Sequence, residues 1–275
     1  MKYYSQFGED YLLRRVFKEK SKGFYIDVGA HDGINLSNTY LFENLGWSGL
    51  CVEANPAIFE LCRKARPNAT CVNAACMGSA NRNSIELYTD PSGFYSGTDS
   101  ASTRESAEAA FRARGEPSPR ISSITVPATT LDKILEQAFP GRVEVDFLSV
   151  DVEGAELEVL KGFDIGRYRP RLMVLEANSK EEDQMLDEYA VSRHGYTKAR
   201  RMYVNNFYVR DPEDVALVAN TWVKCRLARM EDELGELVKL GHVDSVGWSR
   251  PAELKGWPFV KEWIRKELQF LIERP

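Results

Sequence analysis

No stretch of this chain is apolar enough to cross a membrane, because a run of about 18 consecutive apolar residues is absent. The first six residues also lack the apolar core of a secretory signal peptide. Basic residues form no stripe, and the 36 Lys and Arg are outnumbered by 41 Asp and Glu, for a net charge of −5. Proteins that bind nucleic acids usually carry a basic patch. We therefore expect a cytoplasmic protein with neither a membrane span nor a nucleic-acid partner.

Cysteine is scarce and follows no recognisable pattern. The chain has 5 cysteines, an odd number, and no two of them have the spacing of a metal-binding pair. Cys51 and Cys71 lie within apolar stretches that are expected to be strands, which is typical of buried thiols in a reducing compartment. The sequence alone therefore predicts neither a disulfide framework nor a cysteine metal site.

The composition that remains is ordinary for a globular protein, with 43% hydrophobic and 28% charged residues. A length of 275 residues suits one large domain, or one domain with an appendage. Strand and helix patterns alternate up to about residue 210, which predicts an α/β domain over residues 1–210. Residues 211–275 are more helical and more charged, and their apolar stripes predict a helical C-terminal extension that packs on the domain or on a second subunit.

The most informative stretch is a predicted strand that ends in an acid and runs into a loop between two glycines. Phe24 to Val28 suits a buried strand, the loop runs from Gly29 to Gly33, and residues 35–44 have helical character. Glycine lets a ligand approach the backbone closely because it has no Cβ. A strand, a glycine loop and a helix in this order predict a nucleotide site.

The third glycine of a dinucleotide-binding loop is missing here. Asp27 stands two residues before Gly29, where a carboxylate would repel a diphosphate and attract an ammonium. S-adenosylmethionine carries an ammonium, a sulfonium and a ribose, so it fits this pattern better than a nicotinamide dinucleotide. A nicotinamide-dependent oxidoreductase and a binding module without activity stay as the alternatives.

Further cofactor candidates close the neighbouring predicted strands. Glu53 ends the second strand about 20 residues after the loop, where a carboxylate can bind the ribose hydroxyls. Asn55 follows it. Asn73 closes the third strand, where it would either face the adenine edge or cap a turn. Near the N-terminus, Ser5 and Gln6 either precede a helix with acids in its first turn or lie across the cofactor pocket.

A second group of polar residues follows two later strands. Asp151 and Glu153 come after the predicted strand that begins at Val145, and Glu176 and Asn178 end the next strand. We expect Asp151 to be the general base and a further cofactor contact, with His31 as its rival and Glu153 as a second acid at the catalytic site. Asp151, Glu176 and Asn178 offer hard oxygen ligands, which would favour Mg²⁺.

Residues 90–123 change in character and are rich in Ser, Gly, Pro and Arg. Segments of this kind are usually lids or disordered insertions. We expect either a plain insertion or a mobile, substrate-facing lid with a short helix over 106–114. In the second case Phe94 and Tyr95 would serve as platforms for the substrate.

Taken together, these residues resemble the FkbM-type S-adenosylmethionine-dependent methyltransferases. The matching motifs occur in family order and span about residues 5–178: Ser5-Gln6-Phe7-Gly8-Glu9-Asp10, Asp27-Val28-Gly29-Ala30-His31-Asp32-Gly33, Val52-Glu53-Ala54-Asn55-Pro56, Thr130-Leu131-Asp132, Asp151-Val152-Glu153-Gly154 with Glu156 and Leu160-Lys161-Gly162, and Pro170 to Glu176.

The resemblance implies a Rossmann-like class I methyltransferase fold, with a seven-stranded, mostly parallel sheet and helices on both faces. It also implies methyl transfer to a hydroxyl oxygen, commonly of a sugar in a natural product or polysaccharide. The expected partner is thus a small-molecule or glycan acceptor, with a lipid or polyketide hydroxyl as the alternative. An acid, an acid and an amide at two strand ends look like the metal site of catechol-type methyltransferases. A homodimer through the C-terminal helices is a further expectation.

Overall fold

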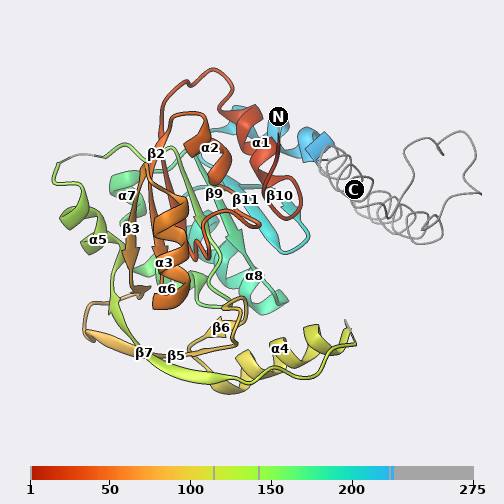
Figure 1. Cartoon of the computed structure of the whole chain (residues 1–275). Coiled ribbons are helices and arrows are strands. Elements are labelled where there is room, and N and C mark those ends of the chain that lie inside the picture. The colour runs from red at the N-terminus through yellow and green to blue at the C-terminus, as the bar shows by residue number, and fades with distance from the viewer. Residues whose placement is uncertain (1, 114, 142, 223, 226–275) are drawn as a thin grey trace, which may run out of the picture.

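The computed structural model describes residues 2–113, 115–141, 143–222 and 224–225 (Figure 1). Its centre is a seven-stranded sheet in the order β10-β11-β9-β8-β1-β2-β3. The strands are β1 (Phe24–Val28), β2 (Ser48–Glu53), β3 (Ala69–Asn73), β8 (Phe147–Val150), β9 (Leu172–Glu176), β10 (Thr197–Met202) and β11 (Asn205–Val209). The five strands from β3 to β9 run parallel, and β11 is antiparallel to both of its neighbours.

Both faces of this sheet are buried, so its strands are apolar at successive positions rather than at alternate ones. In β1, Phe24, Ile26 and Val28 belong to one core, whereas Tyr25 belongs to the other. The first face is covered by α5 (Leu131–Ala138), α6 (Glu156–Lys161), α7 (Ile165–Tyr168), α8 (Lys180–Asp187) and the π-helix η1 (Glu188–Arg193). The second is covered by α1 (Glu9–Val16), α2 (Tyr40–Asn44), α3 (Pro56–Ala65) and the helical residues 212–222 and 224–225. The predicted architecture is therefore confirmed.

A smaller sheet, drawn with α4 below the large one in Figure 1, follows β3 in the chain. It has the order β4-β7-β5-β6 and consists of β4 (Ala75–Cys76), β5 (Ser84–Thr89), β6 (Ser96–Gly97) and β7 (Ser122–Thr129). The segment 90–123 supplies β6 and α4 (Ser100–Ala113), a longer helix than the one expected over 106–114. Asp90 organises its first turn, because the carboxylate accepts hydrogen bonds from the backbone amides of Ser92 and Tyr95. The mobility expected of this segment stays a prediction.

The helix predicted over residues 35–44 is wrong for its first half. Only α2, which begins at Tyr40, is helical. Before it, Oδ1 of Asp32 accepts hydrogen bonds from the amides of Ile34 and Asn35, so the chain turns instead of coiling. No helix N-terminus therefore lies directly after the glycine loop.

The C-terminal extension predicted for 211–275 is described only as far as Cys225. Its described helical part joins the same core as α1, and Val218 and Cys225 have no exposed surface. The homodimer expected through the C-terminal helices lies outside the described residues. Within the residues that are described, no helix combines the length and the apolar character that a membrane span needs.

Candidate active site

The chain reverses its direction of travel across the large sheet between β1 and β8. From β1 it proceeds outward to β2 and β3, and it then crosses back to β8 and β9 on the other side. Open α/β sheets bind ligands at such a switch point, outside the carboxyl ends of the strands. Gly29 follows β1 and Asp151 follows β8, and the Asp151 amide donates a 3.0 Å hydrogen bond to the Val28 carbonyl oxygen. The two predicted loops therefore meet where the fold places its ligand.

Gly29 is where these loops come into contact. Its φ is +84°, and a Cβ added there would lie 1.7 Å from the Asp151 carbonyl oxygen. Gly33, with φ +82°, is similar, since an added Cβ would lie 2.7 Å from Cγ of Arg66. The protein's own packing thus requires both glycines, a reason additional to the approach of a ligand that the sequence suggested.

Substituting Gly29 by alanine should destabilise the protein more than the same change at Gly46. Gly46 has a similar φ of +86° but nothing within 4 Å of an added Cβ. Both variants lose roughly 1–2 kcal/mol to the left-handed backbone, and Gly29→Ala should lose about 2 kcal/mol more because of its clash. Urea denaturation of the two variants measures this difference. Equal losses would show that the loop at Asp151 moves aside freely.

Glu53 connects the loops that follow β1 and β2. One carboxylate oxygen accepts a 3.0 Å hydrogen bond from the His31 amide, and the other accepts a 2.8 Å bond from the Asn55 amide. Burial raises the pKa of Glu53, and these bonds oppose the shift. Each oxygen keeps a further lone pair that can accept another hydrogen bond. Glu53 is thus held at the strand end where we expect a carboxylate that binds the ribose hydroxyls of the cofactor.

The two asparagines predicted as cofactor contacts form hydrogen bonds between their side chains and backbone atoms in this structure. Asn55 is the N-cap of α3, and its side-chain oxygen accepts a 3.0 Å hydrogen bond from the Ala57 amide. The Asn73 side-chain nitrogen donates to the carbonyl oxygens of Glu53 and Ala54, at 2.8 and 2.9 Å. Of the two roles left open for Asn73, bracing a turn is therefore the one that the contacts show. Their contact with a cofactor stays a prediction.

Asp27 is buried and its observed partners are protein groups. Its Oδ2 accepts a 2.5 Å hydrogen bond from the Thr39 hydroxyl, and burial raises the pKa of the carboxyl while the nearby Arg66 lowers it. Arg66 is 1% exposed. It donates to Glu43 at 2.6 Å, to the Gly33 carbonyl at 2.7 Å and to the Thr39 hydroxyl at 2.6 Å. The predicted direct contact of Asp27 with the cofactor stays a prediction.

Sequence reasoning missed the group that Arg66 centres. These residues form no sequence motif, because Glu43 and Thr39 lie 23 and 27 residues before Arg66 in the chain. Together they fix the loop of residues 33–39, which follows the first glycine loop. A single basic residue at the end of a predicted helix gives no signal that it is buried.

The N-terminal segment lies beside this loop, because Ser5 forms a parallel bridge with Leu36. The Ser5 hydroxyl donates a 2.6 Å hydrogen bond to Asp10, which lies in the first turn of α1 with Glu9. Burial raises the pKa of Asp10 to about 6. The helix with acids in its first turn is thus confirmed, and Gln6 is exposed at its approach. A contact between Gln6 and the cofactor stays a prediction.

His31 faces the segment that was expected to be a lid. Its ring stacks on Phe94, with centroids 4.0 Å apart, and Nε2 lies 3.2 Å from the Ser92 carbonyl oxygen. Near the same turn, a Cβ added to Gly93 would lie 2.6 Å from Ile58 of α3. Residues 90–97 thus cover the loops at the ends of β1 and β2. These contacts give the imidazole a packing role, and its rival role as the base stays a prediction.

Three carboxylates converge at the ends of β8 and β9. Oxygen atoms of Asp151, Glu153 and Glu176 all lie within 4.8 Å of one another. Burial and the charge of Asp151 raise the pKa of Glu153 to about 8, and the same two causes raise that of Glu176. Burial also raises the pKa of Asp151. Because like charges this close resist joint ionisation, the cluster holds protons near neutral pH or binds a cation.

Two neighbours support this cluster. The Asn178 side-chain nitrogen donates a 2.9 Å hydrogen bond to Glu176, and the carboxyl group that lies near those of Asp151 and Glu176 is that of Glu153. The metal-binding role expected of Asp151, Glu176 and Asn178 stays a prediction. Glu156, which the sequence marked only through the family motif, accepts bonds from the amides of Val152 and Gly154 at 3.0 and 3.2 Å. It shapes the loop that carries Asp151 and Glu153.

A comparison with family models identifies the chain. The model described as "Methyltransferase FkbM domain" matches residues 27–201. This range includes the loop from Gly29 to Gly33 and the acids Asp151, Glu153 and Glu176. The chain therefore belongs to the FkbM family of S-adenosylmethionine-dependent methyltransferases, and its sheet is that of a class I methyltransferase. A comparison with curated proteins finds no match.

Solved structures resemble this chain only distantly. A TehB-like methyltransferase from Corynebacterium glutamicum is 10% identical with a TM-score of 0.38, over 74% of this chain and 88% of that one. The human methyltransferase 10 domain containing protein is 13% identical with a TM-score of 0.38, over 74% and 80%. TrmK of M. capricolum, in complex with S-adenosylhomocysteine, is 10% identical with a TM-score of 0.36, over 94% and 96%. No conclusion about this chain rests on these likenesses.

Proposed function

We propose that this protein is an O-methyltransferase that moves a methyl group from S-adenosylmethionine to a hydroxyl of a sugar, in a glycan, a polysaccharide or a glycosylated natural product. The main support for the proposal is the contact of Gly29 with Asp151. Because of this contact, the loop from Gly29 to Gly33, where we expect the methyl donor to bind, lies beside the acids Asp151, Glu153 and Glu176. A methyl acceptor that must lose a proton needs a base at this position. An alcohol is such an acceptor.

The acidic side chains of this site suit a methyl donor that carries a positive charge. S-adenosylmethionine supplies a methyl group on a sulfonium, which becomes a neutral thioether when the acceptor oxygen takes the methyl. Glu53 can accept hydrogen bonds from the ribose hydroxyls. The acids Asp151, Glu153 and Glu176 favour the positive charge of the sulfonium beside them. We expect the 90–97 turn to exclude water from this edge, since Phe94 covers His31.

Asp151 is our choice for the group that accepts the acceptor's proton. A general base typically contributes about 10²–10⁴-fold to a rate, and it works best when its pKa lies near the working pH. The raised pKa of Asp151 moves it in this direction. The proton leaves the hydroxyl for the Asp151 carboxylate as the oxygen bonds to the methyl carbon and the carbon–sulfur bond breaks. Orientation of the two reactants supplies the rest.

A divalent cation is compatible with the same acids. Three carboxylates with raised pKa values form an oxygen donor set of the kind that Mg²⁺ binds. Asp151, Glu153 and Glu176 would hold it, with Asn178 beside Glu176. When bound, such an ion lowers the pKa of a coordinated hydroxyl. Activity retained in full after EDTA treatment would leave base catalysis without a metal.

The proposal is tested with S-adenosylmethionine labelled with tritium in its methyl group. The purified protein is incubated with panels of sugars, glycans and glycosylated metabolites, and in parallel with lipid and polyketide alcohols. We expect label in a sugar, in an ether that survives mild base. Label only in the lipid or polyketide panel would overturn the sugar assignment, and label only on nitrogen would overturn O-methylation.

Cofactor binding is measured separately by calorimetry with S-adenosylhomocysteine and with NADH. We expect uptake of S-adenosylhomocysteine alone. Uptake of NADH alone would favour the oxidoreductase. Binding of S-adenosylhomocysteine without transfer to any panel would favour a binding module that has lost its chemistry.

A further inference from the structure

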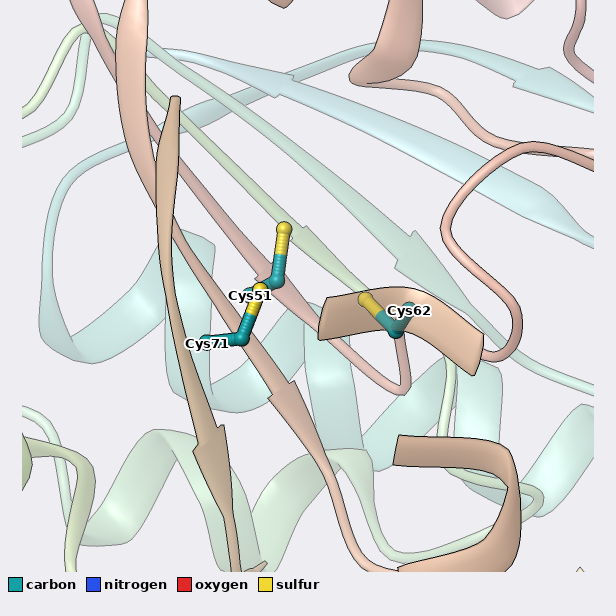
Figure 2. Close-up of side chains that lie close together, drawn as sticks. All are labelled: Cys51, Cys62 and Cys71. Carbon is teal, nitrogen blue, oxygen red and sulfur yellow. The ribbon is translucent and has the colours of Figure 1, made fainter. Parts of the chain in front are cut away.

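Three cysteines from three different elements converge on one point of the domain (Figure 2). Cys51 lies on β2, Cys71 on β3 and Cys62 on α3, and their sulfur atoms are all within 4.8 Å of one another. Cys51 and Cys71 are direct partners in the parallel register of β2 and β3. Their side chains therefore lie on the same face of the sheet, and Cys62 of α3 lies beside them, as Figure 2 shows.

The three cysteines of this thiol cluster differ in their exposure to solvent. Cys51 is 1% and Cys62 0% exposed, whereas Cys71 is half-buried. Small ions can therefore reach the group from the side of Cys71. The remaining free cysteines, Cys76 and Cys225, are buried and belong to no such group among the described residues.

The guanidinium of Arg66 provides a fixed positive charge that acts on both Cys51 and Cys71. The thiolate is the form of cysteine that binds metals. This positive charge would offset part of the negative charge that metal-binding thiolates carry.

The geometry suits a metal ion better than a disulfide. The three cysteines are free thiols whose sulfurs lie within 4.8 Å of one another, whereas the two sulfurs of a disulfide are bonded at about 2.05 Å. A bond between two of the three would also leave the third thiol without a function. Metal–sulfur bonds of about 2.3 Å place the sulfurs of one site roughly 4 Å apart, a spacing that the cluster reaches with small side-chain shifts.

We propose that Cys51, Cys62 and Cys71 form a binding site for one thiophilic metal ion, of the Cu⁺ and Zn²⁺ class. Soft thiolate ligands select these ions over Mg²⁺ and Ca²⁺. Within the described part of the chain the group contains three ligands, which suits three-coordinate Cu⁺ directly and Zn²⁺ with an added water at the Cys71 side. The ion would tie α3 to β2 and β3, and α3 begins directly after Glu53 and its partner Asn55. The site is independent of the proposed methyl transfer.

The test uses Cd²⁺ as a probe on the full-length protein, fully reduced and treated with a chelator under anaerobic conditions. Ultraviolet absorption from thiolate-to-cadmium charge transfer reports the binding. We expect saturation at one Cd²⁺ per chain, and a rise in Tm of roughly 5–10 °C at a Cd²⁺ concentration about 100 times Kd. Competition against Zn²⁺ and Cu⁺ then shows which ion displaces Cd²⁺ and is the natural occupant.

Two variants decide whether these sulfurs hold the ion. Cys71→Ser changes the half-buried ligand and should weaken Cd²⁺ binding by at least about tenfold, a loss that removal of even an outer-shell partner can produce. Cys76→Ala changes a buried cysteine outside the cluster and should leave binding unchanged. Absence of saturable Cd²⁺ binding, equal weakening in both variants, or a disulfide between two of the three cysteines in the protein as purified would each overturn the proposal.

Discussion

Replacing Arg66 with methionine should lower the free energy of unfolding by roughly 3–5 kcal/mol, because removing one partner of a buried ion pair leaves the other charge uncompensated. Arg66 and Glu43 are 0% and 3% exposed in their side chains and are joined at 2.6 Å. The substitution also removes the bonds to the Gly33 carbonyl and to Thr39. Urea denaturation measures the loss. Affinity for S-adenosylhomocysteine should fall as well, since the same bonds fix the 33–39 loop.

Arg63 provides the control on the same helix. It pairs with Glu60 at 2.8 Å, and the two side chains are 55% and 48% exposed. Exposed pairs contribute about 0–1 kcal/mol, so Arg63→Met should be nearly neutral. A loss below about 1 kcal/mol for Arg66→Met would mean that water or a shifted side chain replaces the guanidinium, and that the loop does not depend on it.

The central strands of the large sheet were predictable because β1, β2, β8 and β9 are largely apolar and an acid stands at or next to the end of each. Asp27, Glu53 and Glu176 mark the ends of β1, β2 and β9, and Asp151 follows β8 directly. A strand buried on both faces has little choice of residues, so its pattern survives in the sequence.

Contacts between distant polar residues were not predictable in the same way. Nothing near Arg66 in the sequence indicates that it meets Glu43 and Thr39, since that contact depends on how α3 packs over the loop. The cysteines illustrate the same limit. Spacing along the chain separates Cys51 from Cys71, and only the parallel register of β2 and β3 places them side by side.

Local side-chain bonds explain the remaining differences. Residues 35–39 have helical character in sequence, but Asp32 and Thr39 use their oxygens to build a turn and to reach Asp27. Such bonds compete with helix formation. Gly29 was predictable only in part. Its glycine indicates that another group lies close to the backbone, but the sequence does not show that this group is the Asp151 carbonyl oxygen.

Changing Asp151 to asparagine should lower kcat for methyl transfer by about 10²–10⁴-fold, the contribution of a general base. Asparagine keeps the size of the side chain and the backbone contact with Gly29 but cannot accept the proton. If Asp151 acts as the base, affinity for S-adenosylhomocysteine should change far less than kcat. An equal loss in both quantities would instead make Asp151 a cofactor contact, the other role expected of it.

The pH dependence of kcat distinguishes the base from its neighbours. A base works only when deprotonated, and desolvation by the surrounding protein raises the pKa of Asp151 above its ordinary value, so activity should rise with pH beyond the range in which an ordinary aspartate has already ionised. Asp151→Asn should abolish this rise in whatever activity remains. Glu153→Gln is the comparison variant two residues away, in the same acid cluster. The pKa of Glu153 is raised to about 8, in part by the charge of Asp151. Glu153 therefore still holds its proton where Asp151 ionises, and Glu153→Gln should keep the rise with little shift. A profile that Asp151→Asn leaves unchanged would point to His31 as the base instead.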